Sequence, residues 1–349
     1  MIILLVLIGL SLLIIVHELG HFLTAKLFGV KVDEFGFGFP PKLFGKQFGE
    51  TKYTFNLLPL GGFVKIHGEN GEEQTINDKR SFSYQPIWKK SLIVLAGIST
   101  NIILGFLILS AVFMIGAPEH LMISAIAPDS PAQTAGLETG DIISGIKYEN
   151  TALYDPVKSD EFVNLVKASQ GGMLTLEILR NGELVNISLK GRINPPAGQG
   201  SIGIALGEIG FKPASLTEAV GRGFKDTILN LKLITLGLIG FASKLFVTPN
   251  VLDTVTGPVG IFTLASQTGE LGIVYLLQFM AFISLNLAIL NLMPIPALDG
   301  GRFLFLILEK IIGSRFSRKT QLVMNAVGFT ALIALMIIVT IKDVGRLIQ

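Results

Sequence analysis

The chain opens on a long apolar segment that contains three ionisable side chains at a fixed spacing. Residues 1–16 are almost entirely leucine, isoleucine and valine, and the run continues into the pentapeptide HELGH, in which His17 and His21 flank Glu18. In a helix, residues four apart lie on one face, so both imidazoles would point in the same direction. Ionisable groups are costly at membrane depth and usually mark a functional site there. The chain must therefore fold so that protein encloses this polar group inside or beside the bilayer.

The composition indicates a membrane protein. Half of the 349 residues are hydrophobic and only 15% are charged. A helix needs about 20 apolar residues to cross a bilayer, and four stretches meet that length: residues 2–26, 91–115, 272–299 and 321–341. A further apolar stretch, 225–247, carries Lys225, Asp226, Lys232 and Lys244. We interpret it as an amphipathic helix at the membrane interface.

The first apolar stretch has an alternative interpretation as a cleaved signal peptide. It lacks a basic leader, and its apolar run continues through HELGH, so cleavage would destroy that motif. We therefore expect it to be a retained span.

Composition and charge exclude several classes of site. The chain has no cysteine, which rules out disulfides, thiolate nucleophiles and cysteine-rich zinc sites. Its net charge of +2 gives no reason to expect nucleic acid as a partner. Lysine and arginine instead gather in two loops, within residues 31–90 and 302–319. By the positive-inside rule, both loops should face the cytoplasm.

Residues 33–70 are rich in glycine and phenylalanine, with short apolar runs between Gly and Pro positions. This pattern predicts strands and turns. One interpretation is an ordinary cytoplasmic hairpin. The other is a β-element close to HELGH, with an edge strand within 53–66 that is free to pair with an extended peptide. The residues alone leave both open.

Charged residues return at 117–193, in strand-like runs such as 174–180 and 185–189. Asn181-Gly182 between these runs predicts a hairpin turn. We interpret the region as a small domain inserted between two spans. The expected organisation has four parts: 1–116, with two spans and the β-element; 117–193, the inserted domain; 194–270, a connecting region with the amphipathic helix; and 271–349, with the last two spans.

HExxH on a helix is the signature of zinc-dependent hydrolases, in which two histidines bind the metal and the glutamate acts on a metal-bound water. A catalytic zinc usually has three protein ligands. The other histidines, His67 and His120, lie in the first loop and in the inserted domain, away from the expected depth. Without cysteine, a carboxylate is the natural third ligand. Asp299, at the end of the third apolar stretch, is the candidate; the alternative is a carboxylate that caps a helix end.

Topology supports this choice. If the first span runs toward the cytoplasm, HELGH lies near the cytoplasmic side. Four spans then bring Asp299 to the same depth and keep residues 302–319 in the cytoplasm, as the charge rule requires. Counting 225–247 as a span would send Asp299 to the opposite face.

Further features surround these residues. Pro294 and Pro296 cannot donate backbone hydrogen bonds, so the third span must break or kink before Asp299 and expose polar backbone. Gly97 in the second span favours close helix packing. Asn101, one turn later, is a buried amide that either supports the site or bonds a neighbouring helix.

Together these features resemble the site-2 protease family of intramembrane zinc metalloproteases, specifically the bacterial type that cleaves anti-sigma factors. HELGH matches the family's HExxH, and residues 291–300 match its N-x-x-P-x-P-x-L-D-G motif. Gly97 and Asn101 match its GxxxN pattern. Residues 35–66 are similar to its membrane-associated β-loop, and 130–141 to part of a bacterial PDZ domain.

The resemblance implies a polytopic α-helical membrane protein with about four transmembrane helices, a membrane-associated β-loop and one inserted PDZ domain of α+β type. His17, His21 and Asp299 would bind one zinc ion (Zn2+) per chain, and Glu18 would act as general base and then general acid. For Asn286 and Asn291, helix–helix hydrogen bonding is the alternative to substrate binding. The expected substrate-binding residues are Asn286, Asn291, Pro294 and Pro296, supported by Gly97 and Asn101.

The implied activity is hydrolysis of peptide bonds within transmembrane segments of single-span membrane proteins, such as an anti-sigma factor. The chain would lie in the inner membrane of a bacterium, in contact with the lipid bilayer, with its active site near the cytoplasmic side and its PDZ domain outside. That domain would bind the C-terminus of a pre-trimmed substrate or act as a steric filter. Three alternatives remain: housekeeping removal of remnant signal peptides, a non-proteolytic membrane PDZ scaffold with a structural zinc site, and a transporter.

Overall fold

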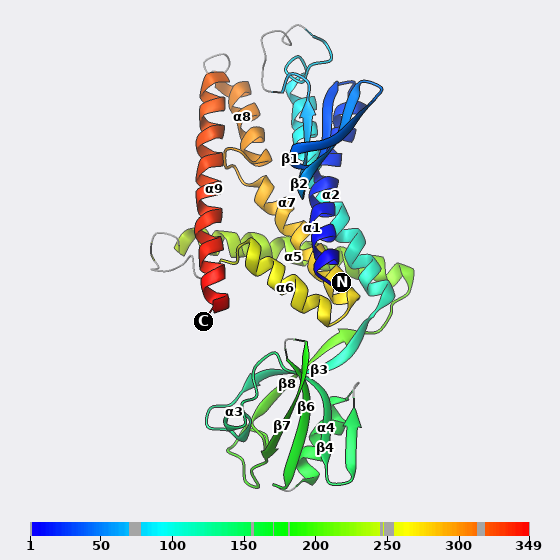
Figure 1. Ribbon diagram of the computed structural model, residues 1–349, viewed down its shortest axis with the longest axis vertical. Coiled ribbons are helices and arrows are strands. Elements are labelled where there is room, and N and C mark those ends of the chain that lie inside the picture. Colours follow the sequence, from blue (N-terminus) through cyan, green and yellow to red (C-terminus); the bar gives the residue numbers. More distant parts are fainter. Residues whose placement is uncertain are drawn as a thin grey trace. The chain divides into compact units, whose positions relative to one another are not determined.

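The computed structural model describes residues 2–69, 78–154, 157–169, 171–180, 182–244, 247, 255–312 and 318–348. The chain divides into two compact units. One combines Met1–Ala111 with Val220–Gln349, and the other is Val112–Ala219. The first unit is built from helices α1 (Ile2–Leu27), α2 (Ile87–Ile115), α5 (Leu216–Lys244), α6 (Pro258–Glu270), α7 (Ile273–Leu292), α8 (Asp299–Ile312) and α9 (Arg318–Ile348), with strands β1 (Val32–Phe48) and β2 (Thr51–Ile66); α2 and α5 run across the boundary between the units (Figure 1).

Five of the described helices are long and apolar enough to cross a membrane: α1, α2, α5, α7 and α9. Four of them cover the apolar stretches predicted from sequence, so the chain is an integral membrane protein. The fifth, α5, covers the stretch that we interpret as interfacial, and its mean hydropathy of 1.3 is the lowest of the five. Figure 1 shows α5 lying across the directions of α1 and α9.

Small residues bring the central helices into backbone contact. A β-carbon on Gly20 of α1 would lie 2.6 Å from the Ala96 carbonyl oxygen of α2. A β-carbon on Gly105 of α2 would lie 2.7 Å from Leu285 Cδ2 of α7. Glycines at such crossings let helices approach closely, because van der Waals packing, rather than burial from water, holds helices together in lipid. The close approach fixes α2 beside the face of α1 that carries the histidines.

The strands predicted within residues 33–70 are confirmed as the antiparallel pair β1 and β2. The pairing is irregular, because β1 bends back and contacts β2 twice: Phe35, for example, pairs with Val64 on one side and with Tyr53 on the other. The segments therefore lie in the order 62–66, 32–37, 51–56 and 42–48. Residues 62–66 form one outer edge of this sheet, whereas 51–56 are enclosed on both sides.

The third predicted span ends earlier than residue 299, and the helix breaks as the prolines predict. α7 stops at Leu292, and α8 begins at Asp299. The connecting loop folds back tightly. A β-carbon on Gly300 would lie 2.2 Å from the Leu292 carbonyl oxygen, and one on Gly301 would lie 2.1 Å from that of Ile295. Asp299 therefore starts a new helix, and its side chain is free to turn toward α1.

The second unit holds a sheet in the order β7-β6-β4-β3-β8, with β5 paired to β4. It extends to Ala219, beyond the domain limit expected at residue 193, because β8 pairs with β3. Asn181 of the expected turn lies outside the described residues, but Arg180 and Glu183 pair as a hairpin requires. The elements are β3 (Ala117–Ile126), α3 (Pro131–Thr134), β4 (Ile142–Tyr148), β5 (Thr151–Tyr154), α4 (Ser159–Ala168), β6 (Met173–Arg180), β7 (Glu183–Lys190) and β8 (Ile204–Phe211).

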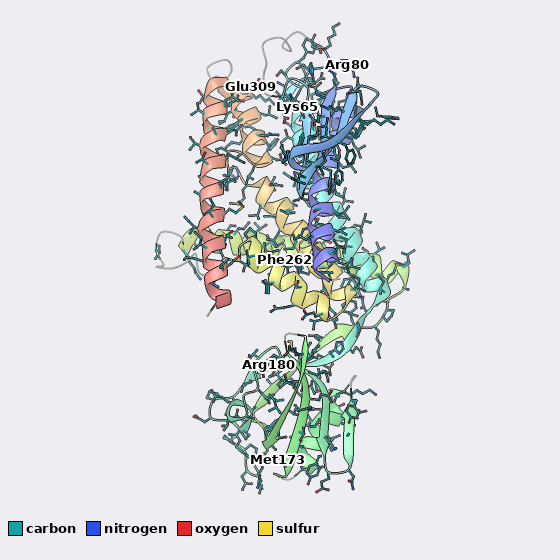
Figure 2. The ribbon with its side chains drawn as sticks, viewed as in Figure 1. Lys65, Arg80, Met173, Arg180, Phe262 and Glu309 are labelled. Carbon is teal, nitrogen blue, oxygen red and sulfur yellow. The ribbon has the colours of Figure 1, made fainter. Side chains whose placement is uncertain are left out.

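Besides its apolar core, this unit holds a group of paired charged side chains. Arg180, which is labelled in Figure 2, lies in this unit. It donates from Nε and Nη2 to the two carboxylate oxygens of Asp141, at 2.7 Å each, and from Nη1 to Glu138. The hydrogen bonds to Asp141 raise the pKa of Arg180, so the guanidinium stays charged. The pair joins β6 to the turn before β4.

Candidate active site

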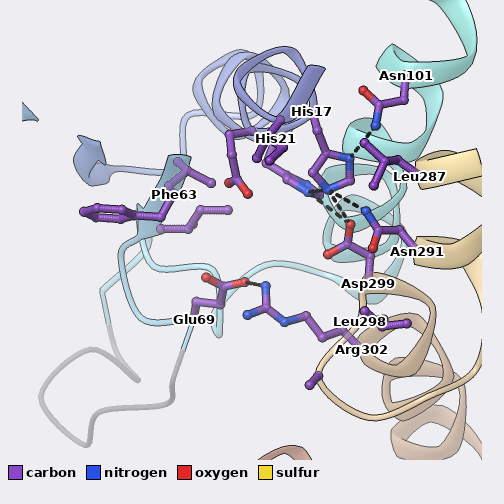
Figure 3. A pocket seen from close by; sticks show the side chains of 15 residues that line it. His17, His21, Phe63, Glu69, Asn101, Leu287, Asn291, Leu298, Asp299 and Arg302 are labelled. Atoms are coloured by element: carbon purple, nitrogen blue, oxygen red, sulfur yellow. Dashed lines mark hydrogen bonds and ion pairs between the residues drawn. The ribbon is translucent and has the colours of Figure 1, made fainter. Parts of the chain in front are cut away.

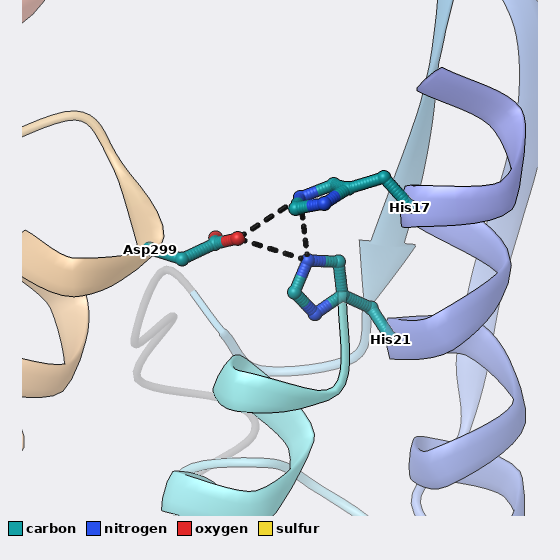
Figure 4. Close-up of side chains that lie close together, drawn as sticks. All are labelled: His17, His21 and Asp299. Atoms are coloured by element: carbon teal, nitrogen blue, oxygen red, sulfur yellow. Dashed lines mark hydrogen bonds and ion pairs between the residues drawn. The ribbon is translucent and has the colours of Figure 1, made fainter. Parts of the chain in front are cut away.

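Three side chains from two distant parts of the chain converge on one point. His17 and His21 lie one turn apart on α1, and Asp299 is the first residue of α8. Asp299 Oδ2 lies 2.9 Å from His17 Nε2 and 3.2 Å from His21 Nε2, and the two Nε2 atoms are 3.2 Å apart (Figure 4). All three residues are buried. Among the described residues, this is the group of His, Asp and Glu side chains spaced to hold a metal ion.

The donor set fits a zinc ion. His21 Nδ1 lies 2.8 Å from the Ile93 carbonyl oxygen, which only accepts, so the ring proton sits on Nδ1 and the Nε2 lone pair points into the cluster. Asp299 Oδ2 is buried and has no hydrogen-bond donor among the described residues. Lone pairs held this close together need a cation between them. Tetrahedral zinc with bonds of about 2.0–2.1 Å places its ligand atoms roughly 3.3–3.4 Å apart, close to the spacing found.

Glu18 lies beside the cluster and not within it. Its side chain lines the same cavity, of about 340 Å³, together with Phe63 and Val64 of β2 and Asn291 of α7 (Figure 3). A β-carbon on Gly62 would lie 3.8 Å from Glu18 Cγ, so β2 runs directly past this carboxylate. The outer edge strand thus forms one wall of the cavity that contains the candidate metal ligands and the acid.

The second helix supports both imidazoles. A β-carbon on Gly97 would stand 2.4 Å from His21 Nε2 and 2.8 Å from His17 Cε1. Asn101 is fully buried, and its amide nitrogen lies 3.5 Å from His17 Nδ1, while its Oδ1 has no partner among the described residues. If His17 binds metal through Nε2, its Nδ1 carries a proton. Exchanging the two ends of the Asn101 amide would then let Oδ1 accept a hydrogen bond from this N–H group.

The structure separates the remaining predicted residues. Asn291 Nδ2 lies 3.4 Å from His17 Nε2 and lines the cavity. Asn286 instead donates to the Phe282 carbonyl oxygen one turn earlier on α7, at 3.2 Å, and is not among the cavity-lining residues. Pro294 and Pro296 lie in the α7–α8 loop, and they too are absent from the cavity wall.

The two other histidines lie elsewhere, as expected. His67 contacts Asp33 Oδ2 at 3.0 Å and Asp78 Oδ2 at 3.3 Å. His120 is in β3 of the second unit. Neither belongs to the cluster on α1 and α8.

Sequence reasoning missed an ion pair in the cavity. Arg302, counted only as part of a cytoplasmic basic loop, donates to Glu69 Oε1 at 2.6 Å, and both side chains line the cavity (Figure 3). Glu69 raises the pKa of Arg302, which therefore stays protonated. Its spacing was a usable signal, because residue 302 follows Asp299 by three positions and shares its helix face.

The formal charges in the cavity also favour a divalent ion. The described lining residues include three carboxylates, on Glu18, Glu69 and Asp299, and one cation, Arg302. With neutral imidazoles the net formal charge is −2. A divalent cation would bring it to zero, which matters because unbalanced charge is expensive away from bulk water.

Comparison with known proteins agrees with this geometry. The model of peptidase family M50 matches residues 5–335. A Clostridium perfringens protein with the provisional name of zinc metalloprotease is 35% identical over 97% of both chains. The regulator of sigma-W protease RasP of Bacillus subtilis is 30% identical over 96% of both chains, and the zinc metalloprotease RasP of Shouchella clausii is 30% identical over 97% of both. The chain belongs to peptidase family M50 and is a zinc metalloprotease of the site-2 protease type.

Proposed function

We propose that this metalloprotease hydrolyses peptide bonds within the transmembrane segments of single-span membrane proteins. The observation that carries the proposal is the position of the cavity. Its acid and its candidate ligands lie on α1 and at the α7–α8 break, among helices long and apolar enough to span a bilayer. A substrate that reaches Glu18 must therefore come from the membrane or from its cytoplasmic surface.

His17, His21 and Asp299 would hold one zinc ion per chain, which supplies a Lewis acid and lowers the pKa of a bound water. Glu18 accepts the proton of the attacking water and passes it to the amine that leaves. Asn291, whose amide lies beside His17 on the cavity wall, donates a hydrogen bond to the carbonyl oxygen of the scissile peptide. The roles of Asn286, Pro294 and Pro296 are indirect: they shape α7 and the loop that presents Asp299.

The outer strand 62–66 is proposed to bind the substrate backbone. The carbonyl groups of an intact helix are engaged in hydrogen bonds, so the substrate must unwind before hydrolysis. Among the described residues, no strand pairs with the outer edge of strand 62–66, and the strand passes Glu18 at Gly62. A substrate segment added to this edge would recover backbone hydrogen bonds as it unwinds. The edge strand predicted within residues 53–66 is therefore limited to 62–66, because residues 51–56 are already paired on both sides.

The substrate class is an anti-sigma factor or a similar single-span protein. The relative from Bacillus subtilis is named as a regulator of sigma-W protease. We place the chain in the inner membrane of a bacterium, with the cavity near the cytoplasmic side. The second unit is proposed to be the PDZ domain, on the outer side, and α5 to lie at the interface. Removal of remnant signal peptides is a second candidate function, because the same cavity would serve it.

The decisive experiment is cleavage of a purified model single-span substrate by the wild-type chain and by Glu18→Gln. Cleavage by the wild type alone, with equal zinc content in both, supports the proposal. Equal cleavage by both removes Glu18 from the mechanism. No cleavage by either, with zinc bound, favours the scaffold interpretation. Where the wild type cleaves, mutations in the second unit would separate the two proposed PDZ roles. Cleavage should stop if the domain must bind the substrate and continue if the domain acts as a filter.

A further inference from the structure

The active-site cavity contains an ion pair that the proposed hydrolysis does not use. Arg302 Nη1 and Glu69 Oε1 are 2.6 Å apart, and the Glu69 side chain is only 16% exposed (Figure 3). Arg302 lies in the first turn of α8, which Asp299 begins, and Glu69 lies in the turn that follows β2. The pair therefore joins the helix that presents a metal ligand to the hairpin that passes Glu18.

The ion pair affects how β2 is aligned with α8, because these two elements hold different parts of the site. Val64 and Ile66 of β2 pack in one apolar cluster with Leu306 of α8. Apolar packing is non-directional and tolerates small sliding. A short charge-assisted hydrogen bond between a guanidinium and a carboxylate restricts the distance between the two groups more narrowly. The pair thus adds to this packing a constraint on where strand 62–66 stands relative to Asp299.

Breaking the ion pair would also be destabilising. Arg302 is the one cation among the described residues that line the cavity, and it faces three carboxylates. Without it, Glu69 would be an unpaired, largely buried negative charge near Glu18. Such a group is destabilising, and the turn that carries it would move to reach water. Movement of that turn would displace strand 62–66, which directly precedes it.

We propose that Arg302 and Glu69 are positioning residues, whose ion pair sets the register of strand 62–66 against α8 and so places a substrate peptide bond at the catalytic residues. The inference rests on the proposed function. It concerns alignment and not metal binding, so the variants should keep their zinc. A misplacement of about 1 Å in an active site can lower the rate roughly 100-fold. We therefore expect the loss to appear in kcat more than in KM.

The test uses the full chain, purified and zinc-loaded, with the variants Arg302→Gln, Glu69→Gln, their combination, and Arg302→Lys. The matched control is Arg80→Gln, because Arg80 also pairs with a glutamate, Glu50, and neither side chain lines the cavity. We expect each single Gln variant to lower kcat about 10- to 100-fold with one zinc per chain. The double variant should be no worse than either single one. Arg302→Lys should recover part of the rate, and Arg80→Gln should match the wild type.

A second readout does not depend on cleavage. The chain has no cysteine, so the exposed residues Leu57 and Ile311 can be replaced by cysteine and spin-labelled without background. The distance between the labels should be narrowly distributed in the parent chain and broad in Arg302→Gln. An unchanged distribution, additive losses in the double variant, or loss of zinc would each overturn the inference. A parent chain that never cleaves would instead overturn the proposed function and leave the distance measurement to decide on the ion pair.

Discussion

The backbone of Gly97 lies against the imidazole of His21, so closely that a β-carbon at residue 97 would stand 2.4 Å from His21 Nε2. The clash would be with the nitrogen that faces the metal position. The contact ties the second helix to the ligand geometry, because the same helix contributes the Ile93 carbonyl that accepts from His21 Nδ1. Displacing α2 would thus disturb the position and the tautomer of one ligand together.

Gly97→Ala should therefore abolish zinc binding and cleavage. Alanine improves helix propensity by roughly 1 kcal/mol over glycine, so helix destabilisation would not explain a loss. The matched control is Gly240→Ala in α5, where an added β-carbon meets nothing within 4 Å. Zinc per chain is measured by atomic absorption. Full zinc content with wild-type cleavage in Gly97→Ala would contradict the packing described.

Asp299→Asn should lose zinc, whereas Glu18→Gln should keep it. The carboxylate of Asp299 would supply a negatively charged ligand atom to the zinc ion, and an amide is a much poorer zinc ligand. Glu18 lines the cavity without entering the cluster, so its loss should lower only the rate, by about 100-fold or more. Zinc content and cleavage of both variants are compared side by side. Zinc retained by Asp299→Asn would remove this residue from the ligand set.

Asn101→Leu should weaken zinc affinity about 10- to 100-fold, because the proton on His17 Nδ1 would lose its acceptor. Asn101→Asp should keep most of the affinity, since a carboxylate oxygen accepts that proton as well. Competition with a chelator measures the affinity. Asn230→Leu in α5 is the control for removing an asparagine from a helix, because in the described part of the chain its side chain donates to the Asp226 carbonyl oxygen of its own helix. Equal affinities in all variants would assign Asn101 to helix packing.

Proline in the outer strand should block cleavage and spare zinc. Adjacent residues of a strand point their N–H groups in opposite directions, so one of Phe63 and Val64 offers its N–H to the free edge. Phe63→Pro and Val64→Pro are made separately, and the one that removes the outward donor should lower cleavage with zinc intact. Lys46→Pro, in the opposite edge segment 42–48, is the control. Unchanged cleavage in both outer-strand variants would exclude strand addition.

Arg180→Leu should destabilise the second unit by about 3–5 kcal/mol, because it leaves the carboxylate of Asp141 buried and unpaired. That side chain is 1% exposed. Lys158→Leu removes an exposed ion pair with Glu161 and should change stability by less than about 1 kcal/mol. Hydrogen exchange of the β6 amides in the full chain reports the local unfolding free energy. Equal protection in the two variants would show that the buried pair adds no stability.

Sequence patterns were enough to predict the apolar helices, the two histidines with the acid between them, and the helix break at Pro294. These follow from local rules: hydropathy, helical spacing and the missing N–H of proline. The sequence also indicated Asp299 as the third ligand, by elimination and by counting spans. The span count depends on α5, whose six charged residues and low mean hydropathy leave its place in the membrane a proposal.

Which side chains meet across distant segments became visible only in the folded chain. Asn286 and Asn291 look alike in sequence, but they lie five residues apart on α7 and therefore point in different directions. Asn291 lies beside His17, whereas Asn286 donates a hydrogen bond within its own helix. The free edge at 62–66 depends on the irregular double pairing of β1, which no local pattern encodes. The Arg302–Glu69 pair spans 233 residues. Such contacts depend on how helices and strands pack in three dimensions, and a one-dimensional pattern carries no record of that packing.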